Sequence, residues 1–222
     1  MLKLINVSVR ETLKNLSLEV QKGEFVLIVG ANGTGKTTLF NAISGAVGLK
    51  NGKVVLNGKD LTNSPPYKRA KLISRVLQEP SLGTIADMTI LENMGLAYMR
   101  KKYKKISRKV VDYFKEKLNM LGMGLENRLT EYVKNLSGGQ KQLLSLAMAT
   151  IDDYELLLLD EITAALDPQT SETVMNIAQK IISQEKKTCL LITHNVKHMD
   201  TFGNRVLEMK NGKLVERQSV SV

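Results

Sequence analysis

The stretch that decides the fold of this 222-residue chain is Gly30-Ala31-Asn32-Gly33-Thr34-Gly35-Lys36-Thr37. It follows an apolar run at residues 25–29 and precedes residues 38–43, which have the character of a helix. The sequence therefore predicts a buried strand, a tight loop and a helix, in that order. The glycines permit positive φ angles, at which successive backbone N–H groups point inward at the positive end of a helix. Such a loop is typical of sites that bind polyphosphates.

The end of this stretch supplies a charge and a hydroxyl group. We predict that Lys36 places its ammonium group on the outer phosphates of a nucleotide. The hydroxyl oxygen of Thr37 is expected to bind Mg²⁺, a cation that takes few protein ligands, and Thr38 completes the predicted nucleotide contacts. The alternative is a glycine-rich turn that matches by chance, which the flanking strand and helix disfavour.

Two further apolar runs end in polar residues. Four leucines at 156–159 precede Asp160 and Glu161, and the run at 189–193 precedes His194. Open α/β sheets bind ligands at the carboxyl ends of their parallel strands. We therefore predict that Asp160 faces the water shell of Mg²⁺, that Glu161 orients or deprotonates the attacking water, and that His194 contacts the γ-phosphate. Solvated acids at a strand end and a merely structural histidine are the simpler alternatives.

A second motif, Leu136-Ser137-Gly138-Gly139-Gln140, predicts the start of a helix that runs to about Thr150. Ser137 and Gln140 have the spacing of a capping box, and the two glycines between them leave the first turn bare. The exposed N–H groups of such a turn suit a phosphate. The alternative is a capped helix start without a ligand.

Together these motifs resemble the ATP-binding cassette (ABC) ATPases, and the resemblance covers the whole chain in the family's order. Gln78 is similar to the glutamine of the family's Q-loop, and Ala165-Leu166-Asp167 to its D-loop. The resemblance implies ATP and Mg²⁺ as cofactors, with Gln78 near the γ-phosphate and the metal. It also implies a head-to-tail homodimer in the ATP-bound state. In that dimer, residues 137–140 complete the ATP site of the other subunit. Asp167 of the D-loop is also expected to contact nucleotide, and the pair Asp167-Pro168 has in addition the pattern of an N-cap followed by proline at the first helical position.

The fold that this resemblance implies is α/β, a P-loop NTPase (RecA-like) core with an antiparallel β subdomain and an inserted α-helical subdomain. We expect a single ABC ATPase domain over residues 1–222, with the core and β subdomain in 1–79 and 151–222 and the helical subdomain in 80–150. The residues themselves predict antiparallel strands around 16–20 and 53–56, a capping box at 89–92 and a hairpin across 211–212.

Length and composition indicate where in the cell the protein is expected to lie. No segment approaches the length of about 20 apolar residues that a membrane-spanning helix needs, and the N-terminus lacks the features of a signal peptide. The single cysteine, Cys189, excludes an internal disulfide and a cysteine zinc cluster. We therefore expect a cytoplasmic protein, peripheral on the inner face of the cell membrane.

The formal net charge of +10 is most visible in the run Arg100-Lys101-Lys102-Tyr103-Lys104-Lys105, which Arg108 and Lys109 extend. This basic run fits a solvated loop, a surface for anionic lipid headgroups, or a nucleic-acid contact. Only Tyr103 offers a ring for base stacking, and no motif for reading nucleic acid accompanies it, so nucleic acid is not an expected partner.

The resemblance narrows further to the detached ATPase subunit of a transporter. The chain lacks the heptad-rich insertions of DNA-bridging relatives, the zinc cysteines of the excision-repair type and the second cassette of the ribosome-associated type. Residues 68–73, 81–84 and 144–150 resemble cassettes that pair with a periplasmic-type substrate-binding protein. This likeness implies import of a solute through separate permease subunits. The open alternative is a soluble ABC ATPase that acts on a ribosome or nucleic acid without a permease.

One departure from the family concerns adenine. Relatives place an aromatic ring against the base from the loop between the first two strands, whereas residues 9–13 contain no aromatic residue. We hypothesise that Arg10 lays its guanidinium group over adenine, a contact worth about 0.5–2 kcal/mol. The alternative is that Arg10 is a solvated turn residue and that adenine touches only Val9.

Overall fold

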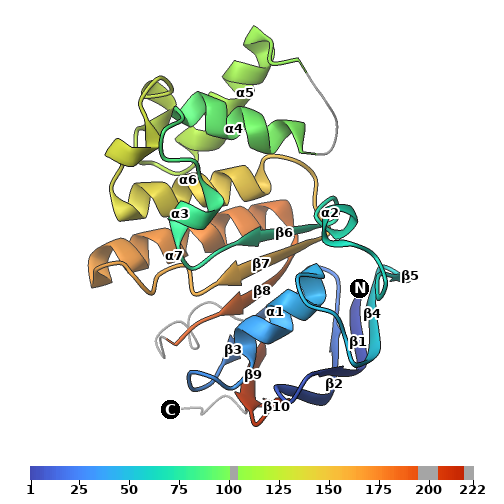
Figure 1. Cartoon of the computed structure of the whole chain (residues 1–222). Coiled ribbons are helices and arrows are strands. Elements are labelled where there is room, and N and C mark those ends of the chain that lie inside the picture. Colours follow the sequence, from blue (N-terminus) through green and yellow to red (C-terminus); the bar gives the residue numbers. More distant parts are fainter. Residues whose placement is uncertain (101–104, 195–204, 218–222) are drawn as a thin grey trace. The chain divides into compact units, whose positions relative to one another are not determined.

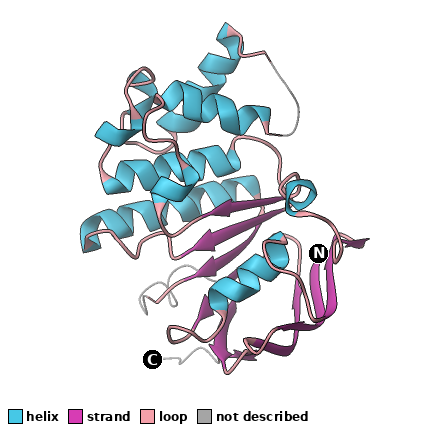
Figure 2. Cartoon of the chain, viewed as in Figure 1, coloured by secondary structure: helices cyan, strands magenta, loops and turns pink. Residues whose placement is uncertain are grey.

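The computed structural model describes residues 1–100, 105–194 and 205–217, which form two compact units. Figures 1 and 2 show their helices and strands. The first unit contains residues 1–73, 155–161 and the described part of 186–222, and the second contains 74–154 and 162–185. The predicted helical subdomain, residues 80–150, lies within the second unit, which also takes in residues 162–185. The predicted boundaries at 79 and 151 stay a prediction.

The first unit begins with an antiparallel sheet of strand order β2-β1-β4-β5. Its strands are β1 (Leu2–Val9), β2 (Leu13–Val20), β4 (Asn51–Leu56) and β5 (Lys59–Asp60). Buried and exposed residues alternate along most of β2, as expected for a strand with one face on the core. The antiparallel strands predicted around 16–20 and 53–56 are confirmed.

The second sheet has the order β10-β9-β3-β8-β7-β6, and the boundary between the units passes through β6 after Ile73. Its strands are β3 (Phe25–Val29), β6 (Ile73–Val76), β7 (Leu156–Asp160), β8 (Thr188–Ile192), β9 (Arg205–Lys210) and β10 (Lys213–Glu216). β3 pairs in parallel with β8 and β9, and β7 pairs in parallel with β8. Every residue of β3, β7 and β8 is buried, which explains why these strands are apolar apart from Asp160 at the end of β7 and Thr188 at the start of β8.

Helix α1 (Lys36–Ser44) follows β3 and joins the core of the first unit with Leu39, Phe40 and Ile43, all fully buried. The short helix α2 (Pro66–Arg69) also belongs to this unit. β9 and β10 form the predicted hairpin, with both turn residues, Asn211 and Gly212, at positive φ. Cys189 lies on β8, where burial raises the pKa of its thiol.

The second unit is mainly helical, apart from the β6 residues that open it. Its helices are α3 (Pro80–Gly83), α4 (Ile90–Met99), α5 (Arg108–Asn119), α6 (Gly138–Thr150), α7 (Pro168–Glu185) and the 3-10 turns Leu125–Asn127 and Val133–Asn135. Both predicted capping boxes are present, at the start of α4 and at the start of α6. Within the described residues, no helix has the length and apolar character to cross a membrane.

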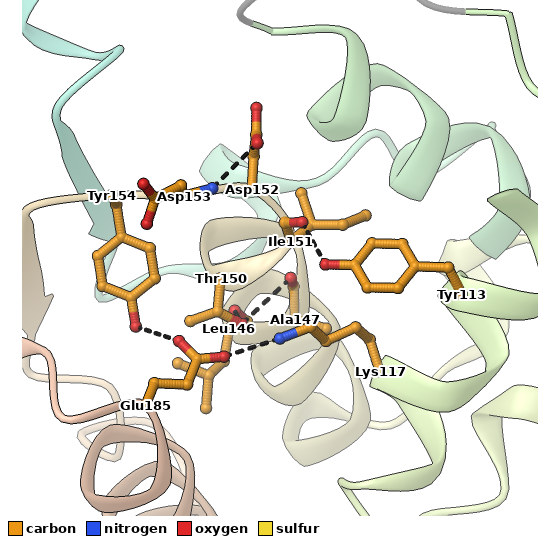
Figure 3. Close-up of polar contacts among 10 residues, drawn as sticks. All are labelled: Tyr113, Lys117, Leu146, Ala147, Thr150, Ile151, Asp152, Asp153, Tyr154 and Glu185. Carbon is orange, nitrogen blue, oxygen red and sulfur yellow. Dashed lines mark hydrogen bonds and ion pairs between the residues drawn. The ribbon is translucent and has the colours of Figure 1, made fainter.

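Polar contacts connect α5 to the segment after α6 and to the last residue of α7 (Figure 3). Tyr113 on α5 donates a hydrogen bond of 2.6 Å to the carbonyl of Ile151. One helical turn later, Lys117 forms an ion pair of 2.7 Å with Glu185, which also accepts a bond of 2.9 Å from the Tyr154 hydroxyl. Burial, with a smaller effect from the negative charge of Glu185, raises the pKa of Tyr113 to about 12.

Candidate functional site

The loop between β3 and α1 has the backbone geometry that its glycines allow. Gly30, Gly33 and Gly35 have φ angles of 146°, 78° and 108°. A Cβ atom on Gly30 would lie 2.5 Å from the carbonyl oxygen of Met209, so a side chain does not fit there. Gly35 caps α1 without a side-chain hydrogen bond. The first N–H groups of α1 are therefore not satisfied by a capping side chain, and they suit an anionic ligand.

Lys36 folds back over this loop. Its Nζ atom donates to the carbonyl oxygens of Gly30 at 2.8 Å and Ala31 at 3.0 Å, and only 5% of the side chain is exposed. Burial lowers the pKa of Lys36, while the negative charges of Glu161 and Asp160 oppose that effect. The positively charged ammonium group of Lys36 thus lies beside the N-terminus of α1, where it would pair with a phosphate group.

The register of the parallel strands brings Asp160, Glu161 and His194 to the edge of the sheet where the loop after β3 lies. Ile192 of β8 pairs with Ile28 of β3 on one side and with Asp160 of β7 on the other. The backbone N–H of Glu161 donates to the Ile192 carbonyl at 3.0 Å. Since these strands run in parallel, the loop after β3, the two acids at the end of β7 and His194 after β8 all lie at the carboxyl edge of the sheet.

Glu161 stands at the centre of this group. Its Oε1 atom lies 2.6 Å from Nε2 of His194 and 3.9 Å from Nζ of Lys36. Glu161 has a φ of 47°, a left-handed conformation that is uncommon for a non-glycine residue and concentrates at functional sites. A carboxylate held beside an imidazole and an ammonium group has the chemistry to accept a proton from, or to orient, a water molecule.

The residues predicted to bind Mg²⁺ have suitable donor atoms. Thr37 is exposed in the first turn of α1, and Asp160, 4% exposed, ends β7 in the same unit, whereas Gln78 belongs to the second unit. Hydroxyl and carboxylate oxygens are the ligands that Mg²⁺ prefers. The described residues contain no cluster of three or more His, Cys, Asp or Glu side chains that could hold a metal by themselves. The residues therefore fit a cation that is bound mainly by water and phosphate oxygens.

The remaining predicted site residues belong to the second unit. Gln78 is exposed between β6 and α3. At the start of α6, Gln140 N donates to Ser137 Oγ at 3.3 Å, and Ser137 N donates to Gln140 Oε1 at 3.1 Å. Asp167 caps α7 by accepting a bond of 3.0 Å from the Thr170 backbone, and hydrogen bonds from Thr170 lower its pKa.

The two glycines of the second motif have different surroundings. Gly138 is exposed, whereas Gly139 is buried against α7, where a Cβ atom would clash with the side chain of Thr170. The bare first turn of α6 therefore also serves close helix packing. The sequence motif did not reveal this second role, because Thr170 is distant in the chain.

The turn that carries Arg10 lies against the loop. Arg10 is exposed with a φ of 45°, and a Cβ atom on Gly35 would be 3.1 Å from Leu13 Cδ2 and 3.2 Å from Thr12 Cγ2. Val9 is only 1% exposed, which disfavours the alternative that adenine touches Val9 alone. The role of Arg10 stays a prediction.

The basic run at 100–105 is only partly described. Residues 101–104 lie outside the described residues, so the structure does not choose among the three interpretations of that run. Arg100 itself donates a hydrogen bond of 3.1 Å to the Ser74 hydroxyl.

Comparison with known proteins agrees with this geometry. The family model described as ABC transporter matches residues 13–164. A tyrosine transport ATP-binding protein of Clostridioides difficile is 42% identical over 205 residues, which cover 91% of this chain and 82% of that protein. The thiamine import ATP-binding protein ThiQ of Histophilus somni is 32% identical over 204 residues, or 92% of each chain.

Solved structures are similar over all or most of their length. A dimeric ATP-binding cassette in a post-hydrolysis state, bound to ADP and Pi, matches with a TM-score of 0.85 and 28% identity over 100% of both chains. A nucleotide-free cassette from an ABC transporter matches with a TM-score of 0.84 and 25% identity, over 97% of this chain and 89% of that one. These likenesses confirm the predicted α/β fold with a P-loop NTPase core.

Proposed function

Because this chain belongs to the ABC transporter family, we propose that it is the ATP-hydrolysing subunit that powers import of a solute through a separate membrane permease. The observation that supports this proposal is that Glu161 lies beside both Lys36 and His194 at the glycine loop. This arrangement places a carboxylate that would activate water next to a loop that would bind phosphate. The relatives named for tyrosine transport and thiamine import support the transport role.

ATP would bind with its phosphates on the loop and on the free N–H groups of α1. Lys36 would exchange its bonds to the carbonyls of Gly30 and Ala31 for bonds to phosphate oxygens, and would then no longer pair with Glu161. Mg²⁺, held by Thr37 and Asp160 directly or through water, would offset the charge of the phosphates. Glu161 would then be free to align the attacking water.

We assign two roles to His194 in the proposed mechanism. Its Nε2 atom lies 2.6 Å from Oε1 of Glu161, and 41% of its side chain is exposed. The exposed imidazole can reach a γ-phosphate that enters the site. His194 would thereby hold the Glu161 carboxylate in place and report the presence of the third phosphate.

A second copy of the chain would complete the site. The solved relative with ADP and Pi is dimeric. At the start of α6, Ser137 and Gly138 are exposed, whereas Gly139 packs against Thr170. In the proposed head-to-tail homodimer, Ser137, Gly138, Gly139 and Gln140 of one copy bind the nucleotide on the other, and Asp167 lies nearby. Gln78 would sense the γ-phosphate and Mg²⁺.

The transport proposal also predicts the remaining partners. Permease subunits would hold the chain at the inner face of the membrane, and a substrate-binding protein would deliver the solute without direct contact. The relative at 42% identity is named for tyrosine, so tyrosine is the first solute to test with the permease.

The decisive experiment uses the Glu161→Gln substitution. The variant should bind ATP and form a stable dimer with MgATP, while hydrolysis falls about 10²-fold or more, because an amide cannot accept the proton from water. Equilibrium binding, analytical ultracentrifugation and phosphate release measure the three properties. Glu172→Gln, which changes an exposed acid of α7, is the matched control. Normal hydrolysis by Glu161→Gln would contradict the assigned role, and a strictly monomeric variant, even with its permease, would contradict the dimer.

A further inference from the structure

Gln142 on α6 connects two motifs that are separate in the sequence. It lies on the same helix, two residues after the end of the Ser137–Gln140 capping box, and is 1% exposed. Its Nε2 atom donates a hydrogen bond of 3.2 Å to the backbone carbonyl of Leu77. Leu77 is the residue immediately before Gln78. The helix that starts with residues 137–140, which we call the signature turn, therefore holds the backbone of the Q-loop.

Packing alone does not explain why a glutamine occupies the buried position 142. Its Oε1 atom is buried and has no hydrogen-bond partner among the described residues. A buried amide with one unsatisfied end is less favourable for folding than an apolar side chain of similar size. The amide therefore lowers the stability of the fold relative to an apolar side chain. Among the described residues, the side-chain hydrogen bond that it makes is the one to Leu77.

A second contact holds the other end of the same segment. A Cβ atom on Gly83 would lie 2.7 Å from Oγ of Ser145, so α3 approaches α6 closely at this point (Figure 1). Ser145 is one helical turn beyond Gln142 and lies on the same face of α6. Residues 77–83 are thus held at both ends by one face of α6, and Gln78 is exposed between the two anchors.

We propose that Gln142 is a positioning residue that transmits the position of the signature turn to Gln78. The inference rests on the proposed function, in which the start of α6 binds the nucleotide of the other subunit. A helix is a rigid element, and the rise from Ser137 to Gln142 is only about 7.5 Å. A shift of α6 on nucleotide capture would therefore move the Leu77 carbonyl, and with it Gln78, which couples the two ATP sites of the dimer.

The first test is Gln142→Met, which removes the amide but keeps the length of the side chain. Steady-state ATP hydrolysis by the full chain should show kcat reduced about tenfold, with KM for ATP almost unchanged and thermal stability equal or higher. Thr150→Val is the matched control, since it removes a buried hydroxyl of the same helix that donates to the carbonyls of Leu146 and Ala147. Gln142→Leu serves as a second variant if Gln142→Met does not fold.

A double-mutant cycle with Gln78→Ala separates positioning from a merely structural role. If Gln142 acts through Gln78, the double variant should hydrolyse ATP no more slowly than Gln78→Ala alone. Losses that multiply, or a wild-type rate for Gln142→Met, would overturn the inference and leave the proposed function intact. A wild-type chain that does not hydrolyse ATP would overturn the proposed function itself.

Discussion

Arg69 is a buried arginine whose loss should destabilise the first unit strongly. Only 2% of this last residue of α2 is exposed. Its guanidinium group donates to the carbonyls of Ala42 and Ile43 at 2.8 Å, Thr62 at 2.9 Å and Ser64 at 3.0 Å. Desolvation lowers the pKa of Arg69, with a smaller opposing effect from Asp60, yet an arginine in a protein stays charged. Arg69 therefore satisfies carbonyl groups in the last turn of α1, the helix that begins at the glycine loop.

The substitution Arg69→Met keeps most of the apolar stem and removes all four hydrogen bonds. A buried acceptor without a partner costs about 1–3 kcal/mol, so even the low end of that range gives a loss of about 4 kcal/mol in the free energy of unfolding. This is a large part of the stability of about 5–15 kcal/mol that is usual for a protein of this kind. Arg69→Lys keeps the charge but not the planar fork, and should lose about half as much.

Urea denaturation followed by circular dichroism measures these changes. Lys68→Met, which alters the exposed neighbour on α2, is the control and should change the free energy of unfolding by less than about 0.5 kcal/mol. If Arg69→Met loses less than about 1 kcal/mol, the argument that its four bonds support α1 is wrong.

Two further predictions concern Tyr113 and Arg10. The pKa of Tyr113 is raised to about 12, against about 10 in an unfolded chain, so the neutral phenol stabilises the fold below about pH 10 and this contribution disappears as the pH rises toward 12. The free energy of unfolding of Tyr113→Phe should consequently fall less steeply in that range than that of the wild type, and parallel pH profiles would refute the assignment. Arg10→Ala should weaken ATP binding by about 0.5–2 kcal/mol, or about 2- to 30-fold, with the exposed Lys14→Ala as control. Unchanged affinity in a calorimetric titration would remove the adenine hypothesis.

Several features were predictable because a few neighbouring residues encode them. The capping boxes at Thr89 and Ser137 are present, and Asp167 caps α7 ahead of Pro168, as their side-chain chemistry predicts. The buried strands β3, β7 and β8 were visible as apolar runs. In each case the residues that specify the feature belong to a single helix, strand or turn. The feature can therefore be predicted without knowing which distant residues it contacts.

Other features depend on residues that are far apart in the chain. Arg69 looks like its neighbours Lys68 and Lys71 in sequence, yet it alone of the three is buried. The bond from Gln142 to Leu77 joins positions 65 residues apart, and the packing of Gly139 against Thr170 joins two helices. No local period or cap encodes such contacts, because they exist only after the elements have packed together.

Taken by itself, the sequence determined that this protein has a glycine loop between a strand and a helix, a pair of acids at a strand end and a capping box at the start of another helix, since backbone geometry and capping are local properties of adjoining residues. Only the tertiary structure decided that Glu161 lies between His194 and Lys36. The physical reason is the strand order β3-β8-β7, which sets the carboxyl ends of three distant segments side by side and which no stretch of residues specifies alone.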